Sequence, residues 1–329
     1  MTSLASIELV DYCDPRIAQV PTRDGFGEGL LEAGRRDSAV VAICADLTES
    51  TRMEAFREAF PARFIEIGVQ EQLLAAMSAG LALAGKVPFI ASYAMFCPGR
   101  AWEQVRTNIC LNDANVKIAG AHAGVSVGPD GATHQAVEDI AILRPIPNIT
   151  IVVPCDAVQT KKATLAAAAM RGPAYIRFGR EKSAVITTAE TPFELGKAQI
   201  FRKGSDVAIV ACGILVYHAL LAAERLARDD GIEALVINNH TIKPMDERAV
   251  EDAARECGAV VTVEEHEVLG GMGSCVAEIL ARRFPVPIEF IGVQNRFGQS
   301  GKPTELIEEY GMSTSSITAA AKRALTRKR

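Results

Sequence analysis

At 329 residues, the chain has room for about two domains of the usual size. Its composition is that of an ordinary globular protein, with 49% apolar and 23% charged residues. A net charge of -5 supplies no positive field for nucleic acid or an anionic membrane, and no apolar run approaches the roughly 20 residues of a membrane-spanning helix. We therefore expect neither nucleic acid nor a membrane among its partners.

The N-terminal residues and the cysteines indicate the cellular compartment in which the protein is expected. Glu8 and Asp11 stand where a secretory signal would carry basic residues, so we expect no signal peptide. Eight cysteines are scattered without a Cys-x-x-Cys pair, and most lie in or beside apolar runs. This pattern is typical of buried, reduced thiols, so we expect a cytoplasmic protein.

Residues 1–20 are irregular, and we expect them to form an arm that lies on the body or on a neighbouring chain. Residues 21–182 then alternate between apolar, strand-like runs and helical patterns. Strands are expected at 38–47, 63–68, 87–93, 115–122, 147–154 and 172–180. Helices are expected at 22–36, 54–60, 69–85, 98–111, 136–143 and 156–172, the last with Asp156 as its N-cap.

The alternation stops at residues 183–196, which contain Pro192 and are expected to be a linker. A second unit follows over residues 197–329. Its strands are expected at 205–212, 232–238, 258–265 and 287–292, and its helices at 216–230, 246–256, 273–284, 302–311 and 315–329. Strands that alternate with helices favour parallel sheets covered on both faces. The expected fold is therefore α/β with two domains, each a mostly parallel sheet flanked by helices.

Polar residues follow the expected strands of the first unit. Because the carboxyl ends of parallel strands meet at one edge of a sheet, ligands bind there and these residues should converge. The residues concerned are Asp46, Ser50, Glu71, Tyr93, Phe96, His122, Asp130, His134 and Arg180.

Glu71 and the two histidines each allow two interpretations. A glutamate in the first turn of a helix complements the helix dipole by roughly 0.3–1 kcal/mol, or it faces a cleft and exchanges a proton with a heterocycle nitrogen. Lone histidines are usually structural, but His122 and His134 flank one glycine-rich loop. Their spacing does not suit a zinc site, so we favour acid–base or hydrogen-bonding roles and expect no metal ligands on this chain.

Other motifs are weaker. The arginines at 23, 52, 100, 106 and 180 each allow a plain surface role, although Arg180 directly follows a strand, where a phosphate is readily held. The glycines of GFGEG (25–29) and GGMG (270–273) do not follow strands as a dinucleotide fingerprint requires. EEHE (264–267) suits a metal cluster less well than a solvated or interface strand end.

An ordered series of motifs resembles the transketolase family over roughly residues 20–325. The first unit contributes GVQEQ, SYAMFCPGRAWEQVR, AHAGVSVGPDGATHQAVEDIAILRPIPN, VVPCDAV and IRFGR. The second contributes NNHTIKPMDE, VEEHEVLGGMGS and FGQSGKPTELIEEYG. The resemblance implies a pyrimidine-binding domain for thiamine diphosphate and a transketolase C-terminal domain.

The resemblance also implies a partner. The family's diphosphate-binding domain carries a Gly-Asp-Gly motif that helps hold Mg²⁺, and no Gly-Asp-Gly occurs in this sequence. We therefore expect one half of a split transketolase, inactive alone. A separate N-terminal subunit would supply the Mg²⁺ and diphosphate ligands, in a dimer of heterodimers that serves sugar metabolism such as the pentose phosphate pathway.

By resemblance, Glu71 matches the glutamate that hydrogen-bonds the pyrimidine ring nitrogen and activates the cofactor. Tyr93 and Phe96 match aromatic residues that stack on the pyrimidine, and Asp46 matches a residue near the thiazolium. His134 matches a proton-transfer histidine near the reacting oxygen.

On the substrate side, His122 and Asp130 resemble groups that hold the donor hydroxyls. The phosphate clamp of the family is matched by Arg23, Ser50 and Arg180. The resemblance thus favours phosphorylated sugars as substrates.

The sequence departs from the family pattern in two places. Gln70 and Gln72 stand where Arg and His are often found around the key glutamate. Gly99 stands where a further stacking aromatic is expected, which would weaken one contact or alter specificity unless Trp102 reaches the same place.

The leading hypothesis is a subunit that transfers a two-carbon ketol unit from a ketose phosphate to an aldose phosphate. One alternative is another thiamine diphosphate enzyme, either 1-deoxy-xylulose-5-phosphate synthase-like or 2-oxoacid dehydrogenase beta-like. The other is a non-catalytic regulatory subunit, which the joint presence of Glu71, His122, Asp130 and His134 disfavours.

Overall fold

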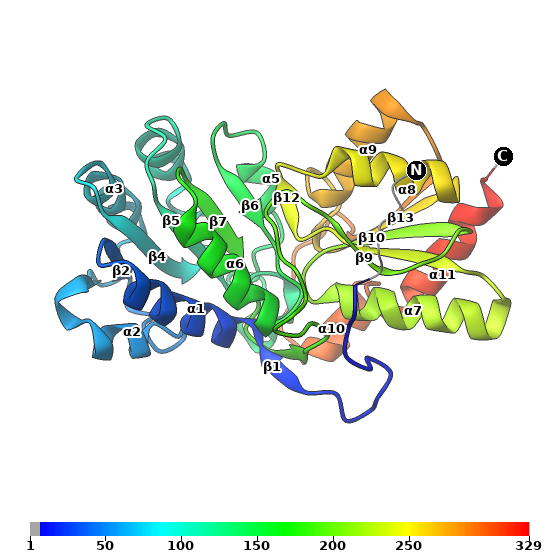
Figure 1. Ribbon diagram of the computed structural model, residues 1–329, viewed down its shortest axis with the longest axis horizontal. Coiled ribbons are helices and arrows are strands. Elements are labelled where there is room, and N and C mark those ends of the chain that lie inside the picture. The colour runs from blue at the N-terminus through cyan, green and yellow to red at the C-terminus, as the bar shows by residue number, and fades with distance from the viewer. Residues whose placement is uncertain (1–6, 329) are drawn as a thin grey trace.

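The computed structural model describes residues 7–328 and shows two α/β units side by side (Figure 1). The first is built on a seven-stranded sheet in the order β12-β6-β7-β5-β4-β2-β3. All neighbouring strands in it are parallel except β12 and β6. The strands are β2 (Val40–Cys44), β3 (Phe64–Glu66), β4 (Val87–Tyr93), β5 (Lys117–Ala121), β6 (Thr150–Val152), β7 (Ala174–Arg177) and β12 (Thr241–Lys243).

Helices cover both faces of this sheet. One face carries α1 (Thr22–Arg36), α2 (Glu54–Ala59), the short turn η1 (Pro61–Arg63) and α6 (Ala157–Ala169). The other carries α3 (Glu71–Leu83), α4 (Trp102–Gln104), the π-helical η2 (Val105–Cys110) and α5 (Asp139–Leu143). The glycines of GFGEG serve the packing of α1 on α6, because a Cβ at Gly25 would lie 1.9 Å from the Ala157 carbonyl oxygen.

The second sheet has the order β14-β13-β10-β11-β9, and only β9 runs antiparallel to its neighbour. Its strands are β9 (Gln199–Arg202), β10 (Val207–Ala211), β11 (Ala234–Asn238), β13 (Val260–Glu267) and β14 (Ile288–Val293). The face toward the first domain is covered by α8 (Glu247–Cys257) and α9 (Met272–Arg283). The opposite face is covered by α7 (Leu215–Asp230), α10 (Pro303–Glu309) and α11 (Thr314–Thr326).

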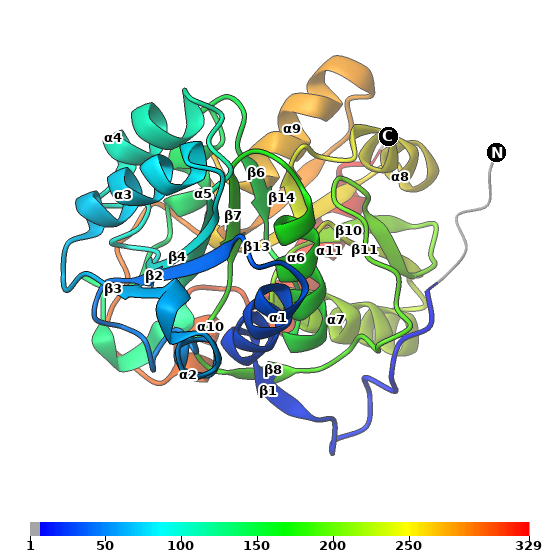
Figure 2. The ribbon, with the colours of Figure 1, turned by 60° about the vertical axis from the view of Figure 1, so that its left-hand side comes forward.

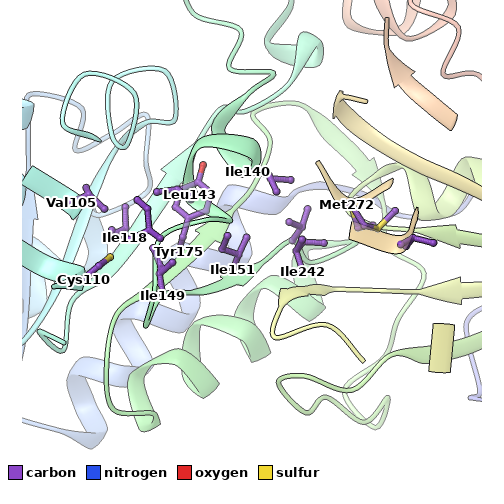
Figure 3. Close-up of a cluster of buried hydrophobic side chains, with 14 of the residues drawn as sticks. Val105, Cys110, Ile118, Ile140, Leu143, Ile149, Ile151, Tyr175, Ile242 and Met272 are labelled. Atoms are coloured by element: carbon purple, nitrogen blue, oxygen red, sulfur yellow. The ribbon is translucent and has the colours of Figure 1, made fainter. Parts of the chain in front are cut away.

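One apolar core runs through both domains without a break. It starts at the helices of the first domain, passes Ile151 and Tyr175, and reaches Ile242 and Met272 of the second domain (Figure 3). Because such a core holds the two sheets together, the second domain is fixed to the first rather than tethered to it.

The predicted α/β class, with two mostly parallel sheets, is confirmed, and Asp156 does cap α6 by accepting from the Gln159 amide at 2.7 Å. Four strands were missed. The segment expected to be a linker contains β8 (Lys182–Ala184), which pairs with β1 (Gln19–Pro21). Neither β9 nor β12 was predicted, and β12 leaves its own domain to join the first sheet.

Two predicted helices are also shorter or less regular than expected. The helix expected at 98–111 is a single α-turn followed by a π-helical segment. The helix expected at 136–143 begins only at Asp139. The described part of the N-terminal arm lies on the second domain, where Tyr12 donates to Glu224 at 2.8 Å (Figure 2). Residues 1–6 of the expected arm lie outside the described residues.

Candidate active site

A cavity of about 510 Å³ lies at the carboxyl edge of the first sheet. Its walls come from the segments that follow β2, β3, β4 and β5, as the topology predicts. It gathers six of the predicted site residues: Asp46, Glu71, Tyr93, Phe96, Asp130 and His134. A larger hollow of about 780 Å³ along β14 in the second domain contains none of them.

Glu71 is the first residue of α3, and its side chain is only 3% exposed. The helix N-terminus and the cavity wall coincide here, so the two interpretations of this carboxylate are compatible. Arg100 donates to Glu71 Oε2 at 3.0 Å, and its guanidinium lies 5.0 Å from the centre of the Phe96 ring. The sequence allowed Arg100 a plain surface role and did not place it in the site. Its position four residues after Phe96 was the only hint that it lies there.

Aromatic rings line the cavity beside Glu71. The Tyr93 and Phe96 rings are stacked at 6.1 Å with an interplanar angle of 18°. The His134 ring meets Phe96 edge-on at 5.3 Å. A flat heterocycle therefore finds apolar ring faces and a buried carboxylate within the same small space.

Arg23, Ser50 and His122 form a hydrogen-bonded group next to the cavity. Arg23 Nη1 donates to the Ser50 carbonyl oxygen at 3.0 Å, and His122 Nε2 lies 3.2 Å from that oxygen. The Tyr93 hydroxyl reaches Ser50 Oγ at 3.4 Å. Burial, and then the charges of Arg23 and Arg180, lower the pKa of His122 to about 3, so its imidazole is neutral.

One ring nitrogen of the neutral His122 imidazole, Nδ1, has no hydrogen-bond partner among residues 7–328. Nε2 lies between the Ser50 carbonyl oxygen at 3.2 Å, which can only accept, and Arg23 Nη1 at 3.5 Å, which can only donate. We assign the ring proton to Nε2 because the Ser50 oxygen is the nearer partner. The buried Nδ1 then has a lone pair. This nitrogen is suited to accept a hydrogen bond from a ligand hydroxyl.

Asp130 and Arg180 pair with each other at 3.0 Å, and both side chains are about one-third exposed. Asp130 follows β5 and Arg180 follows β7. These strands are neighbours in the sheet, so two residues that are fifty positions apart in the sequence come into contact. Asp46 also lines the cavity. Asp46 and His122 both have positive φ, 60° and 55°, which is uncommon for residues other than glycine and clusters at functional sites.

The EEHE segment ends β13 at the contact between the domains, and its side chains bind backbone amides. Glu264 accepts from the first turn of α9 at 2.7 and 2.8 Å, Glu265 from the Ser126 amide at 2.6 Å, and His266 from the Ile140 amide at 3.1 Å. These contacts support the interface interpretation. Within residues 7–328, no three His, Cys, Asp or Glu side chains are grouped as metal ligands.

The interpretation of Gly99 and Trp102 needs correction. A Cβ at Gly99 would lie 2.0 Å from the Met95 carbonyl oxygen, so the tight turn excludes any side chain at this position. Trp102 does not replace an aromatic, because its indole donates to the Ile142 carbonyl oxygen at 2.9 Å and packs against the core. Arg100 instead lies next to Phe96. Gln70 and Gln72 are exposed.

Family comparisons agree with this architecture. The family model "Transketolase, pyrimidine binding domain" matches residues 18–184, and "Transketolase, C-terminal domain" matches residues 196–317. The chain belongs to the transketolase family. The predicted resemblance is thereby confirmed.

Two relatives are similar to this chain over nearly their whole length, and a third is about twice as long. The putative transketolase C-terminal section of Methanocaldococcus jannaschii is 42% identical over 298 residues, which cover 90% of this chain and 93% of that protein. A 6-deoxy-6-sulfo-D-fructose transketolase subunit of Clostridium sp. (strain MSTE9) is 40% identical, with 93% and 95% covered. Human transketolase is 33% identical, and the chain spans about half of its length (51%).

A solved structure described as "Split gene transketolase, inactive beta4 tetramer" superposes with a TM-score of 0.88 at 42% identity. The match covers 94% of this transketolase-family chain and all of that one. Among helices of the described residues, none is long and apolar enough to cross a membrane.

Proposed function

We propose that this chain is the pyrimidine-binding subunit of a two-chain, thiamine diphosphate-dependent transketolase. It would act in the transfer of a two-carbon ketol unit from a ketose phosphate to an aldose phosphate. The observation that carries the proposal is the cavity in which a buried Glu71 lies beside the Tyr93 and Phe96 rings. The unpaired cysteines favour the cytoplasm as its location.

The residues present fit the pyrimidine end of the cofactor. Tyr93 and Phe96 offer ring faces for stacking, and Glu71 offers a carboxylate that exchanges a proton with a ring nitrogen. Asp46 would lie near the thiazolium. When bound, the cofactor supplies a nucleophilic carbon and an electron sink for carbon–carbon cleavage. Arg100 must leave Glu71 or share it for the ring nitrogen to bind there.

The second half of the site holds the substrate. His122 Nδ1 would accept from a donor hydroxyl, and Asp130 would hold another. His134, whose Nδ1 lies 2.9 Å from Thr133 Oγ1, would move a proton at the reacting oxygen. The substrate phosphate would be held by Arg23, Ser50 and Arg180.

Relatives support an acidic sugar substrate. One is the 6-deoxy-6-sulfo-D-fructose transketolase subunit, and another is an apulose-4-phosphate transketolase subunit of Phocaeicola vulgatus, 39% identical. Both names contain a sugar with an anionic group. Three arginines near His122, of which Arg52 is paired with Asp24 at 2.6 Å, suit such a group.

The diphosphate and Mg²⁺ would be held by a partner subunit, since the sequence lacks Gly-Asp-Gly. Two relatives are named as subunits, and the structural neighbour is a tetramer described as inactive. We therefore propose an N-terminal diphosphate-binding partner and a heterotetramer of two such pairs.

The test mixes this chain with the diphosphate-binding subunit, thiamine diphosphate and Mg²⁺, and assays transfer from xylulose 5-phosphate to an aldose phosphate. Activity should require both chains. Full activity from this chain alone would contradict the two-subunit proposal.

The same assay distinguishes the alternatives. The 1-deoxy-D-xylulose-5-phosphate synthase of Heliobacterium modesticaldum is 37% identical over 300 residues, although only 46% of it is covered. If pyruvate replaces the ketose as donor, a synthase-like or 2-oxoacid dehydrogenase-like reaction is supported. A complex that forms without any turnover would support a regulatory subunit.

A further inference from the structure

The glycine-rich segment of residues 123–134, here the site loop, carries Asp130 and His134 at its end. Gly124, Gly128 and Gly131 all have positive φ, between 75° and 87°. A loop with this many glycines loses much conformational entropy when it is ordered, so contacts elsewhere must hold it. Those contacts come largely from the second domain.

Gln135 makes the first of them. Its side chain is buried, and Nε2 shares its two hydrogens among three carbonyl oxygens. Two belong to the site loop, Val125 at 3.1 Å and Gly128 at 3.2 Å. The third belongs to Gln299 of the second domain, at 2.9 Å. One amide group therefore joins both halves of the site loop to the other domain.

The second-domain loop (residues 294–303) lies directly on the site loop. A Cβ on Gly131 would lie 2.6 Å from Ser300 Oγ, and a Cβ on Gly128 would lie 3.1 Å from the Pro303 ring. In return, a Cβ on Gly298 would lie 1.8 Å from Gln135 Oε1. Glycines on both sides thus permit a close backbone approach that larger residues would prevent.

Two further groups fix the ends of this contact. Glu265, at the end of β13, accepts from the Ser126 amide at 2.6 Å and lies against Gly124. The Tyr310 hydroxyl donates to the Phe297 carbonyl oxygen at 2.7 Å and so holds the second-domain loop to its own domain. The apolar core that joins the domains keeps these partners in register (Figure 3).

We infer that the second domain positions the substrate loop of the first, and that Gln135 is the positioning residue that transmits this constraint to Asp130 and His134. The inference rests on the proposed function for the roles of those two residues. Gln135 lies outside the walls of the cavity and acts through the loop it fastens.

The test compares two buried glutamines in the assembled enzyme. Gln135→Met keeps a similar volume and removes the amide donors. Gln159→Met is the matched control, because Gln159 is equally buried and bonds Gln199 of the second domain at 2.9 Å but does not touch the site loop. Each variant is measured for thermal stability, for the apparent affinity of thiamine diphosphate, for KM of the ketose donor, and for hydrogen exchange of residues 125–134.

Both variants should lose some stability. Only Gln135→Met should raise the donor KM, by about tenfold, and speed exchange of the site-loop amides by about tenfold or more, with cofactor affinity within about twofold. Equal KM values, or unchanged exchange in the loop, would overturn the inference and leave Gln135 a purely structural residue.

Tyr310→Phe provides a second route if Gln135→Met does not fold. It frees the second-domain loop without touching the first domain, so it should raise donor KM and loop exchange in the same direction but less. If Gln135→Met does fold, adding Tyr310→Phe to it should change donor KM and loop exchange little, because the connection is already broken. If the effects of the two substitutions on donor KM and loop exchange were fully additive, Gln135 and Tyr310 would not act through the same connection.

The exchange measurement also separates this inference from the proposed function. If the wild-type assembly lacks transferase activity but Gln135→Met still loosens the site loop, the function is wrong and the positioning contact stands. If the wild-type assembly is active but Gln135→Met leaves exchange in the site loop unchanged, the proposed function stands and the positioning role of Gln135 is wrong.

Discussion

Glu71 and Arg100 form an ion pair at 3.0 Å in which the carboxylate is buried and the guanidinium is about half exposed. The pair joins the proposed cofactor-activating group to a cation lying against the Phe96 ring. Because the two residues come from different segments, α3 and the turn after β4, each can be changed without altering the other's backbone.

Glu71→Gln should reduce turnover of the assembled enzyme about a hundredfold or more, because an amide keeps the shape but cannot exchange the proton. The KM for a phosphorylated acceptor should change little, since Glu71 does not contact Arg23 or Arg180. Steady-state kinetics with saturating cofactor measure both values. Turnover close to that of the wild type would remove Glu71 from its proposed role.

Arg100→Met should destabilise the isolated chain by about 1 kcal/mol, since it leaves a buried carboxylate without its counter-charge while Arg100 itself is well solvated. Urea unfolding measures the loss. The double variant with Glu71→Gln should recover part of it, because the uncompensated charge is then gone. A double variant no more stable than Arg100→Met would show that the pair is not the cause.

Gly99→Ala should lower the free energy of unfolding by about 1–3 kcal/mol, because the new Cβ collides with the Met95 carbonyl oxygen. Gly80→Ala in α3 is the control. Its Cβ meets nothing within 4 Å, so this change should stabilise the chain by about 0.5–1 kcal/mol. If Gly99→Ala were neutral, the turn would not require glycine.

Arg180→Met should raise the KM for a phosphorylated acceptor by about tenfold or more, the cost of losing a charged hydrogen bond of roughly 1.5–3 kcal/mol. An unphosphorylated aldehyde such as glycolaldehyde should be affected much less. Arg106→Met, at an exposed position on η2, is the control and should leave both KM values unchanged. Equal losses for both acceptors would argue against a phosphate clamp.

His240 predicts a pH dependence of stability. It is fully buried against Phe193, and burial lowers its pKa from the usual 6.5 to about 4. Because the unfolded chain protonates this histidine first, its stabilising contribution is complete above pH 6.5 and is lost as the pH falls toward 4.

The loss from His240 should reach about 1.4 kcal/mol one pH unit below 6.5. His240→Phe keeps an aromatic ring against Phe193 and removes the titration, so its unfolding free energy should fall less steeply between pH 7 and pH 5. Urea titrations of both proteins at several pH values give the two slopes. Identical slopes would show that His240 does not remain neutral in the folded chain.

The sequence by itself determined the local structure and the composition of the site. The alternation of apolar runs with helical patterns is a short-range signal, and it identified the α/β class and placed Glu71 at the start of α3. Parallel topology then predicted that polar residues after β2, β3, β4 and β5 share one edge. The cavity at that edge contains six of them, whereas Ser50 and His122 lie beside it.

Only the tertiary structure decided the contacts between distant segments. β12 joins the sheet of the other domain, Arg100 meets Glu71, and Gln135 reaches Gln299 across 164 positions of sequence. A short edge strand such as β12 and a single side chain carry no periodic signal, and their partners are set by how distant segments pack in the folded chain. The folded turn after β4 also decided the role of Gly99. An added Cβ there would lie 2.0 Å from the Met95 carbonyl oxygen, a distance that exists only in the folded chain, so this turn requires glycine.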